Sequence, residues 1–312
     1  MITINDIQAA AGRIAPHVRH TPTIEVMAVS EPVTEARLML KLECQQATGS
    51  FKARGATNKL LSMPKDALTN GIVTASGGNH GLAVARAARL ASVPATVFVT
   101  ESATAEKRDK LKRWGADVEV LGAIWNETNE AALTFAERRG AAYFHPFADP
   151  DVVAGQGTVG LELLRAVPDV DVVLVAIGGG GLVSGMAIAL KALKPSVRII
   201  GIEPVGSPTL RACLDAGRLV RLDKVTSRVA TMSCGQTDQK IFETVRDHID
   251  DIVLVSDDAM LEAARWLWFE LGIAADLSGA AAIAALRSGA VTFGRGQTVG
   301  ALVCGAGPDG MS

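Results

Sequence analysis

Four consecutive glycines, Gly178, Gly179, Gly180 and Gly181, separate an aliphatic run at residues 172–177 from a segment of helical composition at residues 182–193. The uninterrupted aliphatic run is typical of a strand that is buried on both faces of a parallel sheet. Four glycines in series lose much conformational entropy on folding, and turn geometry alone explains them poorly. Close approach of a backbone to a phosphate does require the absence of side chains. The pattern therefore predicts a strand, an anion-binding turn and a helix in an α/β fold.

The same alternation of apolar runs and helical segments extends along the chain, and it predicts parallel sheets with helices on both faces. A chain of 312 residues can bury a large core as one or two lobes. Helices are expected in most intervals, including residues 103–114 and 257–271. Strands are expected at residues 37–42, 71–75, 95–100, 117–121, 172–177, 198–202, 252–255 and 298–304.

Charge and cysteine content narrow the class of protein. The 31 basic and 33 acidic residues give a formal charge of −2, which provides no general attraction to nucleic acid or to an anionic membrane. Four cysteines without metal-type spacing, and an N-terminus without a signal-peptide pattern, favour a cytoplasmic location. Asp171 and the glycines indicate that the apolar stretch at residues 170–190 is a buried strand and helix rather than a membrane span. We expect one α/β enzyme with no nucleic-acid or membrane partner.

Lys52 follows a glycine-bearing turn and precedes an expected helix start, within residues 47–56. An amine in that position is well placed to be held against a carbonyl, and lysine is the side chain that forms Schiff bases. Lys52 is therefore the candidate for covalent attachment of an aldehyde cofactor. A helical lysine is more often a solvated charge, and this motif alone leaves that alternative open.

A second loop, at residues 74–81, follows the apolar run at residues 71–73 and precedes an alanine-rich segment at residues 82–90. A strand, a glycine turn and a helix start in that order leave backbone N–H groups unpaired, which suits a carboxylate or phosphate. The amide of Asn79 can also donate to or accept from a ring substituent. A tight turn whose glycines serve only packing is an equally good interpretation of this loop taken alone.

A reactive lysine, an asparagine-bearing anion loop and a glycine-lined phosphate site together describe pyridoxal 5'-phosphate. The sequence resembles the fold-type II, tryptophan-synthase-β-like pyridoxal-phosphate enzymes, in the serine/threonine dehydratase and serine racemase branch. The resemblance implies two open, twisted, mostly parallel sheet lobes with flanking helices, the active site in the cleft between them, and a homodimer. The implied small domain is 48–145, and 1–47 with 146–312 form the large cofactor-binding domain. The matching segments, in the family's order, are residues 49–56, 76–81, 154–158, 178–182, 203–204 and 302–307.

The resemblance also implies roles for individual residues. Lys52 would hold the cofactor and move the α-proton of the substrate, with Phe51 packed near the cofactor. Asn79 would meet the ring hydroxyl, and Cys304 would face the pyridine nitrogen. The phosphate would be bound by Gly178, Gly179, Gly180, Gly181 and Leu182. The substrate carboxylate would be held by the loop of Ser76, Gly77, Gly78, Asn79 and His80.

Departures from the family pattern bear on the reaction. Cys304 replaces the usual Ser or Thr, and Gly77 replaces the second serine that racemases use as an acid on the opposite face of the substrate. Glu203 of the family's cation site is retained, but Thr209 stands where its acidic partner is usual, so we expect no metal. Asp276 is either a carboxylate on the cofactor or substrate side or the N-cap of a helix at residues 278–286.

We therefore expect a pyridoxal-phosphate-dependent ammonia-lyase whose small amino-acid substrate is a β-hydroxy amino acid, L-serine or L-threonine by default, from which it eliminates water. The products would be a 2-oxo acid and ammonia. The alternatives are a dehydratase of 3-hydroxyaspartate or phenylserine, an amino acid racemase, and, from another class, a ligand-binding protein that has lost turnover. Elsewhere in the chain, Trp266, Trp268 and Phe269 are predicted to form the buried face of a helix.

Overall fold

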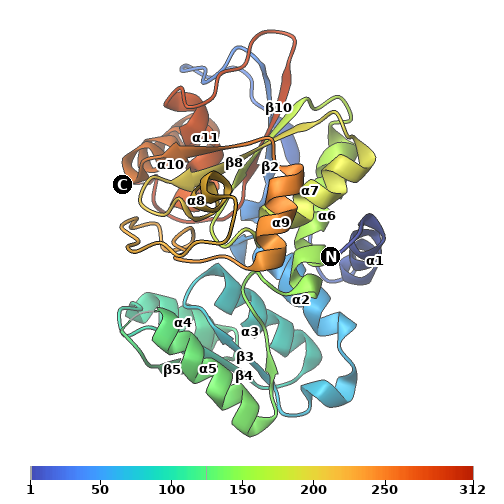
Figure 1. Ribbon diagram of the computed structural model, residues 1–312, viewed down its shortest axis with the longest axis vertical. Coiled ribbons are helices and arrows are strands. Elements are labelled where there is room, and N and C mark those ends of the chain that lie inside the picture. Colours follow the sequence, from blue (N-terminus) through green and yellow to red (C-terminus); the bar gives the residue numbers. More distant parts are fainter. Residues whose placement is uncertain (1, 124, 312) are drawn as a thin grey trace.

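The computed structural model describes residues 2–123 and 125–311, and it places two sheets in two lobes, one above the other (Figure 1). The larger sheet has six strands in the order β1-β2-β10-β7-β8-β9, and the smaller has four in the order β5-β4-β3-β6. The strands are β1 Thr23–Glu25, β2 Arg37–Leu42, β3 Ile72–Ala75, β4 Ala95–Val99, β5 Asp117–Val120, β6 Ala142–Tyr143, β7 Val172–Ala176, β8 Arg198–Pro204, β9 Asp251–Val255 and β10 Thr298–Val303.

Helices occupy most of the intervals between strands, as the sequence predicts. In Figure 1, α10 and α11 lie on one side of the larger sheet, and α6 and α7 lie on the other. The helices are α1 Ile4–Ile14, α2 Lys52–Ser62, α3 Asn79–Ala91, α4 Ala105–Arg113, α5 Trp125–Arg139, α6 Pro150–Ala166, α7 Gly181–Leu193, α8 Thr209–Ala216, α9 Gln239–His248, α10 Asp257–Leu271 and α11 Leu277–Arg287; the 3-10 turns are η1 Glu43–Gln45, η2 Ala47–Gly49 and η3 Lys65–Leu68.

Both sheets are almost entirely parallel. The exception is the antiparallel pair of β1 with β2, at one edge of the larger sheet. The central strands β7 and β10 are parallel neighbours, with Val299 opposite Val172, and every residue of both strands is buried. Burial on both faces explains their unbroken aliphatic sequences. The predicted fold, two mostly parallel lobes with flanking helices, is confirmed.

Three local features differ from the sequence analysis. The strands β1 and β6 were not predicted from the sequence. They have only three and two residues, too few to produce a recognisable hydrophobic pattern. In α10, Trp266 is buried with 4% of its surface exposed, but Trp268 and Phe269 are 41% and 80% exposed. The expectation that all three form a buried face is therefore wrong for the last two. Helical periodicity places Trp268, two positions after Trp266, on the opposite side of α10.

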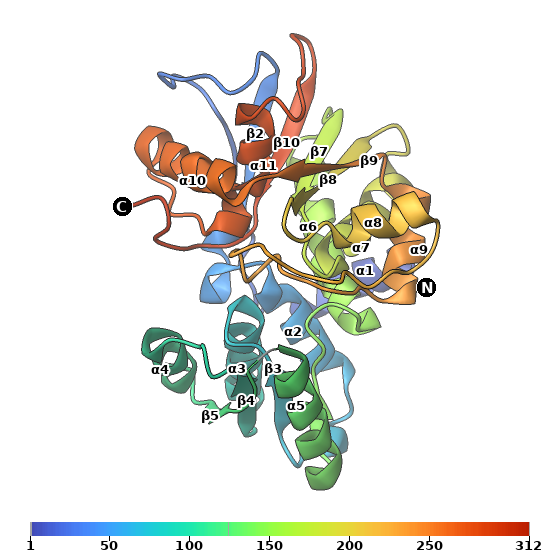
Figure 2. The same cartoon turned by 60° about the vertical axis from the view of Figure 1, so that its left-hand side comes forward.

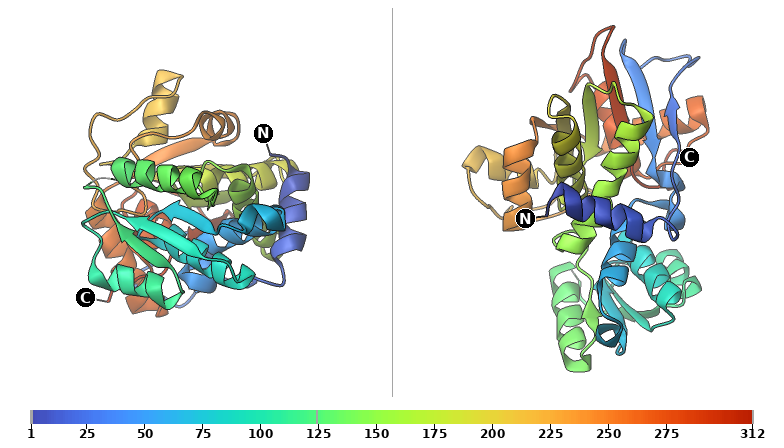
Figure 3. Two further views of the ribbon diagram at one scale, coloured as in Figure 1. Left: turned by 90° about the horizontal axis from the view of Figure 1, so that it is seen from below. Right: turned by 90° about the vertical axis from the view of Figure 1, so that its right-hand side faces the viewer.

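Several segments meet where the two lobes join. Helix α1 lies across α6 and α2 at this level (Figure 3, right). Figure 2 shows that the extended segment between α8 and α9 runs along the side of the larger lobe that faces the smaller one. Within residues 2–123 and 125–311, no helix is both long and apolar enough to cross a bilayer.

Candidate active site

Lys52 is the first residue of α2, at the junction of the two lobes. The turn before it contains Thr48 with φ 62° and Gly49 with φ 81°. This turn is fastened to the end of the central strand β10. The Phe51 N–H donates to the Cys304 carbonyl at 3.2 Å, and the Ala306 N–H donates to the Gly49 carbonyl at 2.8 Å. The C-terminal end of a parallel strand therefore fixes where the Lys52 side chain begins.

The Lys52 amine is partly buried and hydrogen-bonded. Its Nζ donates to the carbonyl of Pro146 at 2.6 Å and lies 5.1 Å from the centre of the Phe51 ring. Burial lowers the pKa of Lys52 to about 8, and the negative charge that the Cys304 and Cys234 thiols could develop opposes this shift. The amine is not a solvated surface charge, which was the alternative for this residue.

Arg54, two residues further along α2, points into a buried group of charges. Its guanidinium donates to Glu43 at 2.7 Å and to Glu162 at 2.7 Å, and Lys41 donates to the same Glu162 at 2.6 Å. The side chains of Lys41, Glu43 and Arg54 are at most 1% exposed. These ion pairs tie α2 to the end of β2 and to α6, so they hold the helix that carries Lys52.

The four glycines form the turn between β7 and α7. Gly180 has φ 94°, a conformation that residues with a Cβ rarely adopt. A Cβ on Gly179 would lie 2.2 Å from Cδ1 of Phe147, and one on Gly178 would lie 3.0 Å from the Thr231 carbonyl. The turn is therefore lined by bare backbone, and Phe147 joins it to Pro146, the acceptor of the Lys52 hydrogen bond.

The helices that belong to the three predicted motifs differ from most other helices of the chain in how they start. The N-cap residues of α2, α3 and α7 are Phe51, Gly78 and Gly180, and in the described part of the chain none of these helix starts has a capping side chain. By contrast, a side chain caps α1, α4, α6, α9, α10 and α11. Backbone N–H groups at the α3 and α7 starts are thus available to anions. Together with an amine of lowered pKa, this donor set fits pyridoxal 5'-phosphate.

Asn79 and Cys304 are linked through a chain of polar side chains. The Asn79 amide donates to Asp276 at 3.0 Å, and the Ser278 hydroxyl donates to Asp276 at 2.6 Å. The Cys304 thiol donates to the Ser278 hydroxyl at 3.7 Å. Asp276 also caps α11 through the Gly279 N–H at 2.6 Å, so the N-cap interpretation of this residue is correct, and it also touches a predicted site residue.

Burial controls the protonation of Cys304 and Asp276. It raises the pKa of the Cys304 thiol far above its ordinary value, and it raises the pKa of Asp276, against hydrogen bonds from Ser278, Gly279 and Asn79. The thiol therefore stays neutral at physiological pH. A neutral thiol opposite a ring nitrogen does not favour protonation of that nitrogen as a carboxylate would.

The loop before α3 has the expected glycine turn, but His80 differs from its neighbours. The Gly78 N–H donates to the Ser76 hydroxyl at 3.3 Å, and a Cβ on Gly77 would only touch Val99 at 3.5 Å. His80 is buried, and its Nε2 makes a 3.0 Å hydrogen bond to the Phe144 carbonyl. Burial lowers the pKa of His80 to about 3, so the ring is neutral. The carbonyl of Phe144 accepts the single N–H of this neutral ring, so any contact of His80 with an anion is made by its backbone N–H.

Glu203, the retained residue of the family's cation site, binds backbone N–H groups at the start of a helix in this structure. Its carboxylate accepts the N–H groups of Leu210 at 2.8 Å and Arg211 at 2.9 Å, so it caps α8. Burial raises the pKa of Glu203 to about 7. Thr209 donates its hydroxyl to the Cys234 carbonyl. Across the described residues, no three His, Cys, Asp or Glu side chains are arranged to hold a metal ion.

The structure adds contacts that the sequence analysis did not predict. Pro146 and Phe147 bridge Lys52 to the glycine turn. Thr231 packs against both Gly178 and Gly78, and its Cγ2 lies 3.9 Å from the place that a Cβ on Gly78 would occupy. No periodicity or motif predicts these contacts, because they join segments far apart in the chain.

Comparison with known proteins defines the class to which this fold and site belong. Residues 14–305 match the family described as pyridoxal-phosphate dependent enzyme. The L-threonine ammonia-lyase of Thermotoga maritima is 38% identical over 286 residues, which is 92% of this chain and 71% of that protein. A serine racemase of Oryza sativa is 37% identical over 290 residues, which is 91% of this chain and 84% of the relative. The crystal structure of a threonine deaminase from T.th. superposes with a TM-score of 0.90 at 36% identity, covering 98% of both chains.

The chain belongs to the family of pyridoxal-phosphate-dependent enzymes. Within that family it falls in the serine/threonine dehydratase and serine racemase branch of fold type II. The predicted cofactor and the predicted enzyme class, a pyridoxal-phosphate-dependent ammonia-lyase, are confirmed. An amino acid is accordingly its type of substrate.

Proposed function

We propose that this enzyme eliminates water from L-serine or L-threonine and releases ammonia and a 2-oxo acid. The observation that carries the proposal is the partly buried Lys52 amine, with a pKa of about 8, at the junction of the two lobes. Relatives named L-threonine ammonia-lyase and L-threonine dehydratase support the same reaction. Dehydration of 3-hydroxyaspartate or phenylserine is the related possibility that differs only in the substrate side chain.

When bound, pyridoxal phosphate supplies an aldehyde that condenses with amino groups and a ring that acidifies the α-hydrogen of an amino acid. The protein's own groups would do the rest. The Lys52 Nζ would hold the cofactor and later accept the α-proton, and its lowered pKa leaves a useful neutral fraction near pH 7. The Asn79 amide would orient the ring hydroxyl, while Cys304 would present a neutral thiol to the ring nitrogen.

Backbone N–H groups would bind the two anions. The turn Gly178 to Gly181 and the first amides of α7, including that of Leu182, would bind the cofactor phosphate. The loop from Ser76 to His80 would hold the substrate carboxylate at the uncapped start of α3. Because Asp276 occupies one hydrogen of the Asn79 amide, the orientation of that amide is fixed before any ligand binds.

Racemisation is the second candidate function, since relatives named serine racemase share 37% identity. It requires an acid on the face of the substrate opposite Lys52. Gly77 stands at the position where racemases carry that acid, and the atoms nearest to its Cβ position belong to Val99 and Ala103. These side chains cannot donate a proton, which favours elimination.

The deciding assay measures ammonia and 2-oxo acid from purified, cofactor-loaded enzyme with L-serine, L-threonine, 3-hydroxyaspartate and phenylserine. A chiral assay of the remaining amino acid runs in parallel. We expect ammonia release from at least one substrate, and none from Lys52→Ala. Racemisation without ammonia would favour the second candidate. Loaded enzyme that turns over none of these compounds would instead favour a ligand-binding protein.

We also propose a small domain at residues 48–145 and a large domain formed by residues 1–47 and 146–312. All four strands of the smaller sheet lie between Ile72 and Tyr143, which supports these boundaries. We further propose a cytoplasmic homodimer. The four cysteines are unpaired, as is usual in reducing compartments, and exposed apolar side chains such as Met27 and Phe269 offer contact area. Sedimentation analysis would reveal the assembly state.

A further inference from the structure

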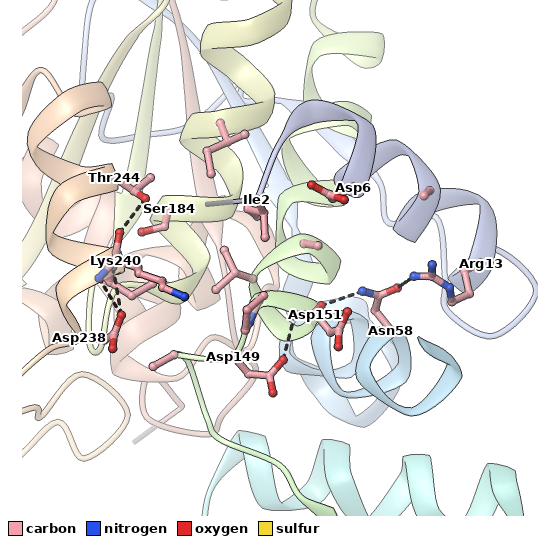
Figure 4. A pocket seen from close by; sticks show the side chains of 17 residues that line it. Ile2, Asp6, Arg13, Asn58, Asp149, Asp151, Ser184, Asp238, Lys240 and Thr244 are labelled. Carbon is pink, nitrogen blue, oxygen red and sulfur yellow. Dashed lines mark hydrogen bonds between the residues drawn. The ribbon is translucent and has the colours of Figure 1, made fainter. Parts of the chain in front are cut away.

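A cavity of about 330 Å³ lies between α1, α6, α7 and α9, outside the candidate active site (Figure 4). Its lining includes neither Lys52, Asn79 and Cys304 nor any residue of the glycine turn. The volume suits a small metabolite rather than a few water molecules. The cavity is therefore a separate place where a ligand could bind.

Ser184, in the first turn of α7, supplies a buried polar group at this cavity. The residue is only 1% exposed, and its Oγ has no hydrogen-bond partner among the described residues. In Figure 4 the Ser184 hydroxyl lies between α7 and α9, near Thr244 and Lys240. A buried hydroxyl without a partner costs free energy, so this group is better explained if a ligand completes its hydrogen bonding.

Among its charged side chains, the cavity also presents an unpaired carboxylate oxygen and an unpaired ammonium. Asp238 caps α9 through Oδ1, which accepts the N–H of Lys240 at 2.8 Å, and this leaves Oδ2 without a partner in the described structure. The Lys240 side chain is exposed to solvent, and its ammonium has no ion-pair or hydrogen-bond partner within residues 2–123 and 125–311. Another carboxylate of the lining, Asp149, is already engaged, because it caps α6 and pairs with Lys59 at 3.0 Å.

The other charged residues of the lining already have partners: Asp6 accepts the Thr3 N–H, Arg13 donates to Asn58, and Asp151 pairs with Lys59. The aliphatic part of the wall includes Ile2, Val153, Ile188 and Ile241. A ligand that satisfies the unpaired groups of the lining therefore has an anionic group for Lys240, a cationic group for Asp238 and a short aliphatic part. We propose that the cavity is a binding site for a small aliphatic α-amino acid, held as a zwitterion. The carboxylate pairs with Lys240 and Ser184, and the ammonium pairs with Asp238.

The test uses cofactor-loaded enzyme and L-leucine, which has no hydroxyl to eliminate. Titration calorimetry detects every binding event, whereas the absorbance of the cofactor reports occupancy of the Lys52 site alone. We expect a calorimetric event that is not accompanied by an absorbance change. Two probes each lack one charge of leucine: 4-methyl-2-oxopentanoate has no ammonium, and 3-methylbutylamine has no carboxylate. Each is expected to bind at least tenfold more weakly.

Variants of the cavity residues test whether the calorimetric binding of L-leucine takes place in the cavity. Lys240→Glu is expected to weaken it at least tenfold, and Ser184→Ala about threefold, since the latter removes only a hydroxyl. Lys112→Ala, an exposed lysine on α4 of the smaller lobe, is the control and is expected to change nothing. Circular dichroism and the cofactor absorbance verify that each variant is folded and loaded.

The proposal is overturned if leucine gives no such event, if the event is unchanged in both Lys240→Glu and Ser184→Ala, or if either single-charge probe binds as tightly as leucine. Turnover of β-hydroxy amino acids is a separate measurement. Failure of this binding test is thus distinguishable from failure of the proposed reaction.

Discussion

The Asn79 amide donates a 3.0 Å hydrogen bond to Asp276, across 197 positions of sequence, and thereby joins α3 of the smaller lobe to the start of α11 in the larger one. Asp276 is at the same time the cap of α11. One carboxylate thus stabilises a helix and orients an amide that we assign to the cofactor.

Replacing Asp276 distinguishes its role as the cap of α11 from its role in orienting the Asn79 amide. We expect Asp276→Ala to lower the free energy of unfolding by about 1 kcal/mol, because the cap of α11 is lost. We also expect it to weaken cofactor binding several-fold, because Asn79 is released. Ser256→Ala, which removes the cap of α10, is the matched control. Urea unfolding of the cofactor-free protein should show a similar loss for both variants, whereas cofactor titration should distinguish them. Equal cofactor affinity in both would contradict the role assigned to Asn79.

A side chain at Gly180 should damage the phosphate site. Gly180 has φ 94°, and a Cβ there would lie 2.5 Å from Ile241 Cγ2. Gly180→Ala is therefore expected to cost about 1–2 kcal/mol in backbone strain and to weaken cofactor binding at least tenfold. Gly217 also has positive φ, 64°, but its Cβ position is open. Gly217→Ala should show the strain in thermal unfolding while binding the cofactor normally.

Arg54 should be essential for stability although it does not contact the reaction centre. Arg54→Met leaves Glu43 buried without its guanidinium partner, so we expect a loss of about 3–5 kcal/mol in the free energy of unfolding. The exposed pair of Arg228 and Asp258 provides the comparison. Arg228→Ala should cost less than about 1 kcal/mol. Denaturant titration of the two variants would detect the difference, and a similar small loss for both would show that the buried network is not required.

The lowered pKa of Lys52 makes attachment of the cofactor depend on pH. The neutral amine is the nucleophile, so the attachment rate should rise as pH increases and level off above about 8, the pKa set by burial. An exposed lysine would instead continue to gain reactivity up to its ordinary pKa near 10.5. Stopped-flow absorbance on cofactor-free protein, from pH 6.5 to 10, follows this reaction. A rate that still increases steeply at pH 10 would mean that Lys52 is not desolvated in solution.

Much of this description could be predicted because the signals are local. The aliphatic run at residues 172–177 indicates a buried strand by composition alone, and α10 occupies the residues expected for it, Asp257–Leu271. Likewise, Asp276 carries the usual signal of an N-cap. The exposure of Trp268 and Phe269 could not be predicted in this way, since it depends on which face of α10 packs against the larger sheet.

The amino-acid sequence by itself determined the alternation of strands and helices, the bare glycine turn and the position of Lys52, since each depends on neighbouring residues. Only the tertiary structure decided that Pro146 accepts a hydrogen bond from Lys52, that Glu203 caps α8 and that Asp276 meets Asn79. Those pairs come from distant segments, and their distances and burial exist only after the two sheets have packed. Burial is also what lowers the pKa of Lys52, so the reactivity of this amine is a property of the fold.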